Sequence, residues 1–292
     1  MKTRFVACLF AIAIVSGAAF AQRPAPLYPD ITPVLSLDAL RKISLPNTTI
    51  ESVVADEKEG SVRITAIVTH PPATDRVTVW VALPLKNWNG RFQGNGGGGF
   101  VGGSAGSLRG PVTQGFAAAA TDTGHEGGSG SFALDENGRQ NWQAIIDNAY
   151  LGIHEMTVVG KALTQAYYGK APRYSYFVGG STGGRQGLME AQRYPNDYDG
   201  IISACPAINW HRFVPASLWP QVVMLAMTNF VPKSKLDAAT AAAVKACDAL
   251  DGVTDGVIND PLRCGYDPKA LVGTKVIFDI INAKWKLEKL SI

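Results

Sequence analysis

One serine of this chain occupies a motif that can create a nucleophile. Ser181 lies at the centre of a G-x-S-x-G run over residues 179–183, after the apolar stretch YSYFV and before helix-forming residues that start at Gly184. A sharp strand-to-helix turn strains the serine backbone and requires small neighbours. The amide of Thr182, at the helix start, can stabilise an oxyanion there. Such a run is also typical of a plain turn, but the predicted strand and helix around it favour a nucleophile.

A glycine-rich loop precedes this motif in the chain. Residues 96–99 are all glycine, and Phe100 follows them directly. Because glycine lets the main chain approach a substrate carbonyl, the loop is predicted to supply the second half of an oxyanion hole. A plain flexible loop and a phosphate-binding loop are the alternatives. The phosphate interpretation is the weaker one, since the loop lacks the Lys-Ser/Thr of a P-loop.

An acidic loop offers a second kind of chemistry. Asp248, Asp251 and Asp255 fall within eight residues, and Gly252 and Gly256 let the chain curl between them. Carboxylates on one concave side of a loop are the hard oxygen ligands that calcium takes. The loop lacks the Glu at position twelve of an EF-hand, so a solvated acidic turn is the alternative.

Strands separated by helices would position these residues. Alternating apolar residues predict two strands, over 61–70 and 76–85, joined by a Pro-Pro turn. Further elements are predicted as strands over 91–94, 116–120, 174–178 and 200–205 and as helices over 37–42, 148–168 and 184–193. This order predicts an α/β sheet that is antiparallel at its start and parallel at its centre.

The composition and the hydrophobic pattern of the sequence change after residue 206. Residues 207–232 are aromatic and apolar without clean alternation, and residues 234–248 predict an Ala-rich helix capped by Ser234. We interpret this part as a lid inserted into the sheet domain. Because the acidic loop belongs to the lid, a calcium ion there is expected to be structural.

The histidines are few, which matters because an activated serine needs a base. His125 belongs to the run DTGH over 122–125, at the carboxyl end of a predicted strand, where sites collect in α/β sheets. His154 is expected to be a packed structural residue, and His70 an exposed strand end. His211 follows the serine but precedes the lid, so it is a weak candidate for a substitute base.

Composition and the first residues limit the class of protein. With 292 residues, 46% hydrophobic and 17% charged, the chain can bury a core, and a net charge of +3 suits no nucleic-acid partner. Residues 1–21 combine a basic start, an apolar run and an Ala-Phe-Ala end, which predicts a cleaved secretory signal peptide. The apolar run is shorter than the roughly 20 residues of a spanning helix, so no membrane partner is expected. The sequence therefore predicts a secreted or periplasmic protein in which disulfides are allowed.

Four segments together resemble the tannase and feruloyl esterase family of secreted α/β hydrolases: residues 175–210, GGGGF at 96–100, DTGH at 122–125, and the loop 247–264. The likeness covers residues 28–272. It implies an α/β-hydrolase fold with an inserted lid domain, incomplete at its C-terminus. The expected parts are a signal peptide (1–21), a core (22–206), a lid domain with the calcium loop (207–272) and a divergent tail (273–292).

The resemblance also implies roles for residues of the core. Ser181 matches the nucleophile of a serine esterase that cleaves hydroxycinnamoyl or galloyl esters through an acyl-enzyme. The Thr182 amide, with Gly98 or Gly99, matches the oxyanion hole. A small aromatic ester is therefore the expected substrate.

In the lid, the resemblance adds backbone carbonyls of Val253 and Val257 to the three aspartates as ligands of a structural Ca²⁺. It also implies a disulfide between Cys247 and Cys264. Closing a loop of this length could add about 3 kcal/mol. Cys205 has no expected partner and is interpreted as a small buried side chain.

This sequence departs from the family pattern at its C-terminus, where similarity fades after residue 272. The acid and histidine of the family lie beyond the lid, so Ser181 is expected to lack its base. The interior strand over 200–205 would then lie at an edge, where a second chain could complete the sheet. The family's Cys before the serine is also missing, because Gly180 occupies that position. Two hypotheses remain: a serine ester hydrolase, or a non-catalytic, calcium-stabilised remnant that only binds.

Overall fold

The computed structural model describes residues 24–273, 275–278 and 286–289. It divides the chain into two units, Met1–Ile208 and Asn209–Ile292. The predicted signal peptide, residues 1–21, and most of the predicted tail, 273–292, lie outside the described residues. Each unit is considered by itself below.

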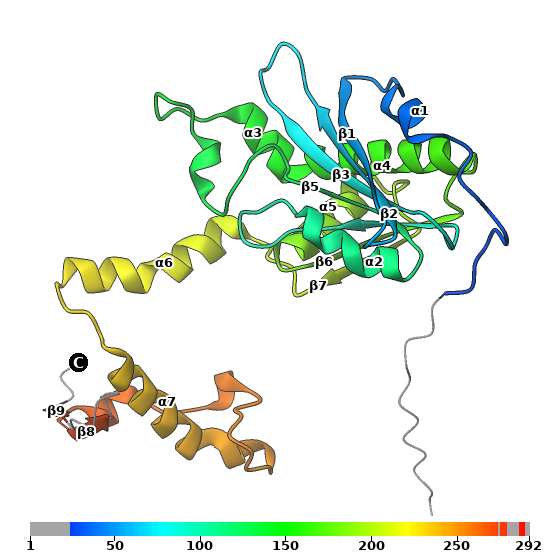
Figure 1. Ribbon diagram of the computed structural model, residues 1–292. Helices are drawn as coiled ribbons and strands as arrows, with labels where there is room; N and C mark the ends of the chain where they lie inside the picture. Colours follow the sequence, from blue (N-terminus) through cyan, green and yellow to red (C-terminus); the bar gives the residue numbers. More distant parts are fainter. Residues whose placement is uncertain (1–23, 274, 279–285, 290–292) are drawn as a thin grey trace, which may run out of the picture. The chain divides into compact units, whose positions relative to one another are not determined.

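A seven-stranded mixed sheet forms the centre of the first unit (Figure 1). Its strands in chain order are β1 (Thr48–Asp56), β2 (Ser61–Val68), β3 (Val77–Pro84), β4 (Arg91–Asn95), β5 (Ala117–Thr121), β6 (Tyr174–Gly180) and β7 (Gly200–Ala204). Their spatial order is β1-β2-β3-β5-β4-β6-β7. Antiparallel pairs join β1 to β2, β2 to β3 and β3 to β5. Parallel pairs join β4 to β5, β4 to β6 and β6 to β7. The predicted α/β sheet, antiparallel first and parallel at its centre, is confirmed.

Alternation along the strands gives the sheet two covered faces. Val79 and Val81 of β3 and Ala119 of β5 pack in the larger core with the long helix α4 (Gly152–Tyr168). Ala82 and the neighbouring Ala118 point to the other face, where they pack with the short segments η1 (Ala105–Leu108) and α2 (Arg109–Thr113). Small alanines in β5 allow helices to approach both faces closely.

The remaining helical segments of the first unit are α1 (Leu37–Arg41), η2 (Gly130–Ala133), α3 (Trp142–Ile146), the π-helical turn η3 (Asp147–Leu151) and α5 (Thr182–Arg193). The sequence predicts one helix over 148–168, but the structure has the π turn over the first residues of that range and a further helix, α3, before it. Single π turns inside helices are rare, and they are frequently found at functional sites. The π turn ends before Gly152, where a Cβ would lie 3.0 Å from the Cα of Thr123.

The first strand was not predicted. β1 carries a bulge between Ile50 and Ser52, which shifts its register against β2 and interrupts the alternation on which strand prediction depends. At the opposite side of the sheet, β7 is the last strand, as expected for residues 200–205.

The second unit contains α6 (Trp210–Ala226), α7 (Lys233–Cys247), three short turns of 3-10 helix and a two-stranded hairpin. The turns are η4 (Asp248–Asp251), η5 (Pro261–Arg263) and η6 (Pro268–Leu271), and the hairpin pairs β8 (Lys275–Phe278) with β9 (Lys286–Lys289). The prediction that Ser234 caps α7 is wrong, because the cap residue is Pro232 and no side chain bonds there. Throughout the described part of the chain, no helix combines the length and apolarity needed to cross a membrane.

Candidate active site

Ser181 occupies a sharp turn between β6 and α5. Its backbone has φ 56° and ψ −116°, a left-handed conformation that residues other than glycine rarely adopt. The turn is fixed on both sides, because the Ser181 N–H donates to Ala204 O at 3.0 Å and its carbonyl accepts from the amides of Arg185 and Ala207. The side chain remains exposed. The structure therefore places this hydroxyl as the nucleophile motif requires.

Glycines around the serine are required by close backbone contacts. A Cβ at Gly179 would lie 2.3 Å from Gly183 O, and one at Gly184 would lie 2.4 Å from Ala204 O. Both distances are far shorter than a van der Waals contact, so no other residue fits without moving the backbone. Gly180 differs, since a Cβ there would meet nothing closer than 3.9 Å.

The glycine loop is fastened to the start of α5 by side-chain and backbone bonds. Buried Gln186 accepts from Gly97 N at 2.9 Å and donates to Gly102 O at 3.1 Å. The Thr182 hydroxyl donates to Gly99 O at 2.5 Å. These bonds place residues 96–99 beside the serine turn.

Two amides near the serine have no acceptor among the described residues. The Gly98 N–H donates to Val101 O at 3.1 Å, so it is already engaged. The N–H groups of Gly99 and Thr182 take part in no hydrogen bond in the described chain. Of the two predicted glycines, Gly99 is therefore the better candidate for an oxyanion donor.

No described histidine of the first unit is hydrogen-bonded to the Ser181 hydroxyl, and each bonds to another group. His125 Nε2 lies 2.6 Å from Phe100 O, and its ring stacks on Phe132. His154 Nδ1 bonds to Asp197 Oδ2 at 2.6 Å, as a structural histidine would. Among residues 24–208, no side chain is hydrogen-bonded to the Ser181 hydroxyl, so the geometry here shows no general base.

The prediction that His70 is exposed is wrong. Its side chain is 16% exposed and lies 2.5 Å from Asp75 Oδ2 and 2.7 Å from Glu155 Oε1. Asp147 Oδ1 approaches the same ring at 3.7 Å. Sequence reasoning missed this cluster because Asp147 and Glu155 come from a distant segment, and the π turn that presents Asp147 leaves no sequence signal.

Burial is the main cause of the raised pKa values of two carboxyl groups in this cluster. Burial raises the pKa of Asp147 to about 6, and it also raises the pKa of Glu155. For His70, burial lowers the pKa, but hydrogen bonds to Glu155 and Asp75 outweigh it, so the pKa is raised overall. The cluster therefore favours positive charge on or near the imidazole.

A second buried acid belongs to α5 itself. Glu190 is fully buried on the helix that begins at the serine turn. Burial, followed by the charge of Asp197, raises the pKa of Glu190 to about 8. Its carboxyl group is thus neutral in much of the physiological range.

The acidic loop of the second unit is curled by its own side chains. Asp248 Oδ1 accepts from the amides of Asp255 and Gly256 at 3.2 and 3.0 Å, and Asp251 Oδ1 accepts from Val253 N at 2.9 Å. This backbone bond lowers the pKa of Asp251. The carboxylate oxygens of this loop are of the kind that calcium binds, but they do not converge on one point. In the described chain, only His70, Asp75 and Asp147 bring three side-chain ligand atoms within 4.8 Å of one another.

Two of the cysteines pair as the resemblance implies. Cys247 and Cys264 form a disulfide, with 5.5 Å between their Cα atoms, and it encloses the acidic loop. Cys205 is free and exposed, so the prediction that it is buried is wrong. Its backbone, at φ 34°, turns out of the sheet at the end of β7.

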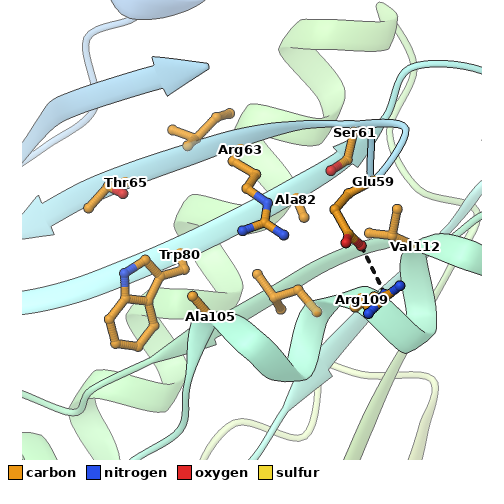
Figure 2. Close-up of a pocket in the computed structure, with 11 residues that line it drawn as sticks. Glu59, Ser61, Arg63, Thr65, Trp80, Ala82, Ala105, Arg109 and Val112 are labelled. Atoms are coloured by element: carbon orange, nitrogen blue, oxygen red, sulfur yellow. Dashed lines mark ion pairs between the residues drawn. The ribbon is translucent and has the colours of Figure 1, made fainter. Parts of the chain in front are cut away.

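A separate hollow of about 230 Å³ lies on the face covered by η1 and α2 (Figure 2). It shares no lining residue with the serine turn. Arg109 at its rim pairs with Glu59 at 3.0 Å, and Arg63 pairs with Asp56 at 3.2 Å. Since both guanidinium groups are neutralised by partners, the hollow offers no unmatched charge to a ligand.

Comparisons with known proteins agree with this geometry. The family described as "Tannase and feruloyl esterase" matches residues 63–277. The chain is 44% identical over 238 residues to a probable feruloyl esterase of Arthroderma benhamiae, covering 80% of this chain and 43% of that protein. It resembles the crystal structure of feruloyl esterase B from Aspergillus oryzae with a TM-score of 0.68 at 30% identity, over 81% of this chain and 51% of that one.

Tannin acyl hydrolase from Aspergillus niger is similar as well, with a TM-score of 0.71 at 26% identity, over 88% of this chain and 52% of that chain. The chain thus spans about half or less of the length of these relatives. Its mixed sheet, with helices on both faces, is part of an α/β-hydrolase fold. With the match over residues 63–277, the chain belongs to the tannase and feruloyl esterase family.

Proposed function

We propose that this chain carries the nucleophile half of a serine carboxylic-ester hydrolase, with Ser181 as the attacking residue. The observation that carries the proposal is the exposed hydroxyl held at positive φ between β6 and α5, with two unengaged amides beside it. Strained strand-to-helix turns of this kind serve nucleophiles in α/β hydrolases. Family membership supports the same assignment.

In the proposed reaction, the Ser181 oxygen attacks the ester carbonyl carbon, and the carbonyl oxygen becomes an oxyanion. The N–H groups of Thr182 and Gly99 would donate to that oxyanion. The C–O bond to the alcohol then breaks, leaving an acyl-enzyme on Ser181, which water hydrolyses to the free acid and the original serine. Donors fixed before the reaction stabilise the developing charge without reorganisation.

The general base is proposed to come from sequence C-terminal to residue 208. On this fold, the acid and the histidine follow the serine along the chain. The three histidines of the first unit all precede Ser181, and each has a ring nitrogen bonded to another group, although His125 Nδ1 is buried without a hydrogen-bond partner among the described residues. None of them is therefore assigned as the base.

Aromatic carboxylic esters are the proposed substrate class. Phe100 follows the glycine loop, and Phe132 lies against both Phe100 and His125, with ring centroids 6.5 and 3.9 Å apart. Flat rings of this kind can stack on an aryl acid. The relatives named feruloyl esterase and tannin acyl hydrolase support a hydroxycinnamoyl or galloyl acyl group.

Two further features are proposed with the function. Ca²⁺ would be held by Asp248, Asp251 and Asp255 with the carbonyls of Val253 and Val257, which requires the aspartate side chains to turn toward one another from their bonds to the loop amides. The ion would stabilise the loop without taking part in the reaction. Secretion is proposed from the leader-like residues 1–21, and the disulfide in the second unit is compatible with an oxidising compartment.

The experiment is active-site labelling with a fluorophosphonate, read by peptide mass spectrometry, together with hydrolysis of methyl ferulate and methyl gallate. We expect the label on Ser181, its loss in Ser181→Ala, and its retention in the control Ser217→Ala, which changes an exposed serine of α6. Ester hydrolysis should be lost together with the label in Ser181→Ala, and it is expected to be slow unless residues after 208 supply a base. A folded wild-type chain that takes no label, or a label that survives Ser181→Ala, would contradict the proposal. Equal rates on ethyl acetate and on the aryl esters would contradict the substrate class alone.

A further inference from the structure

The cluster around His70 lies outside the site proposed above. His70 and Asp75 flank the turn between β2 and β3, Asp147 opens the π turn, and Glu155 belongs to the first turn of α4. β3 is separated from β6 by β5 and β4, so three strand spacings of about 4.8 Å lie between this turn and the serine strand. The cluster therefore does not touch the reacting atoms.

The two ring nitrogens of His70 face different partners. Nε2 lies 2.7 Å from Glu155 Oε1, whereas Nδ1 faces both Asp75 Oδ2, at 2.5 Å, and Asp147 Oδ1, at 3.7 Å. If Nε2–H donates to Glu155, the lone pair of Nδ1 confronts two carboxylate oxygens. Such an arrangement is repulsive unless a proton or a cation lies between them.

Asp147 provides a second, independent observation. Its side chain is fully buried, and its Oδ2 has no hydrogen-bond partner among the described residues. Only Gln143 donates to its other oxygen, at 2.8 Å. Burying a carboxylate with an unsatisfied oxygen costs free energy, which a positive charge beside the group would offset.

We propose that His70 Nδ1, Asp75 and Asp147 form a binding site for a divalent transition-metal cation of the zinc class, oriented by Glu155. One nitrogen and two carboxylate oxygens suit zinc better than calcium, which prefers oxygen ligands alone. Glu155 occupies the position of the carboxylate that commonly accepts the second ring N–H of a metal-bound histidine.

The distances agree with this assignment after a small adjustment. Two ligands about 2.1 Å from a tetrahedral zinc are about 3.4 Å apart. The 3.7 Å between His70 and Asp147 is already close to that value, and the 2.5 Å between His70 and Asp75 must open by about 1 Å. Side-chain rotation at the turn, where His70 is partly exposed, can supply that movement.

The bound cation would have a positioning role. Gly124 closely approaches Asp147, since a Cβ there would lie 3.1 Å from that side chain. The following residue, His125, bonds to Phe100 O beside the glycine loop. A cation on Asp147 would therefore stiffen the loop over 122–125, whose His125 bonds to the residue that follows the glycine loop.

The test titrates Zn²⁺ by calorimetry and Co²⁺ by visible absorption, using the full chain in buffer that contains calcium to occupy hard oxygen sites. We expect one Zn²⁺ per wild-type chain, ligand-field bands with Co²⁺, and a higher melting temperature with Zn²⁺. His70→Ala should lower the Zn²⁺ affinity by about 100-fold or more, and Asp147→Asn by at least about 10-fold. Ester hydrolysis is not the readout, so failure here is distinct from failure of the proposed function.

His154→Ala is the matched control, because His154 also bonds to a carboxylate, that of Asp197, but is not one of the three residues whose ligand atoms lie together. It should change the affinity by less than threefold. If His70→Ala does not fold, Asp75→Asn replaces it with the same expectation. A wild-type chain that takes up no Zn²⁺, or an affinity that is unchanged in the folded His70 or Asp75 variant, overturns the proposal.

Discussion

The serine turn and the acidic loop show two ways of shaping a candidate site. The turn at Ser181 is determined by packing: buried backbone contacts leave no room for a side chain at Gly179 or Gly184. The acidic loop is open, its glycines meet nothing within 4 Å, and it depends on a disulfide and on aspartates that bond to its own amides. The stability of the serine turn should therefore respond to changes of side-chain volume. The stability of the acidic loop should respond to loss of the disulfide, of a carboxylate charge or of a bound ion.

The largest effect should come from Gly179→Ala. The new methyl group would lie 2.3 Å from Gly183 O, so the turn must shift, at a cost of about 3 kcal/mol in the free energy of unfolding. Fluorophosphonate labelling of Ser181 should be lost as well. The control is Gly180→Ala, where the nearest atoms are 3.9 Å away and a change within about 0.5 kcal/mol is expected. Denaturant melts of both variants measure the difference, and equal losses would contradict a packing-determined turn.

The next effect concerns the crosslink. Cys264→Ser opens a loop with a sequence separation of 17, which should cost about 3 kcal/mol of local stability in the second unit. Trypsin should then cleave after Arg263 faster than in the wild-type chain, as followed by mass spectrometry. Cys205→Ser removes the free cysteine instead and should leave the cleavage rate unchanged. If both variants are cleaved at the same rate, the disulfide does not hold the loop.

Calcium removal tests whether the loop binds an ion. At a calcium concentration 100 times the Kd, binding stabilises the folded state by about 2.7 kcal/mol, so chelation should lower the melting temperature. Asp251→Asn should abolish that response, whereas Asp237→Asn, which changes an exposed aspartate of α7, should preserve it. A melting curve that chelation does not change would remove calcium from this loop.

A pH dependence of stability carried by Glu190 is expected as well. Its pKa is raised to about 8 in the folded chain, above its ordinary value near 4.5, so the folded state holds the proton more tightly. The stability from this proton is fully present below about pH 4.5 and is lost as the pH rises through 8. Glu190→Gln keeps the neutral form and should flatten the fall in unfolding free energy between these values. An identical pH profile in wild type and variant would show that Glu190 is ionised after folding.

The strands and the turn at Ser181 could be predicted because each is determined by residues that are close together in the sequence. Alternation over 61–70 and 76–85 reports which face is buried, and a glycine-flanked serine reports a sharp turn. The bulge in β1 interrupted that pattern, so the strand was missed. Even so, the change from antiparallel to parallel pairing could be inferred from the alternation of strands and helices.

Features that depend on distant partners could not be predicted. His70 looks like an exposed strand end until Glu155, 85 residues away, is placed beside it. Cys205 looks like part of a buried strand, yet β7 is an edge strand and its end is exposed. The engagement of the Gly98 amide with Val101 likewise depends on a loop geometry that composition does not encode.

The positive φ of Ser181 has a consequence for how this position can evolve. Any residue with a Cβ is strained there by about 1–3 kcal/mol, whereas glycine is not. The Ser181→Gly variant would therefore be more stable than the wild-type chain and would lack the proposed nucleophile. If the proposed function holds, stability favours glycine at this position and the reaction requires serine, so the two requirements oppose each other.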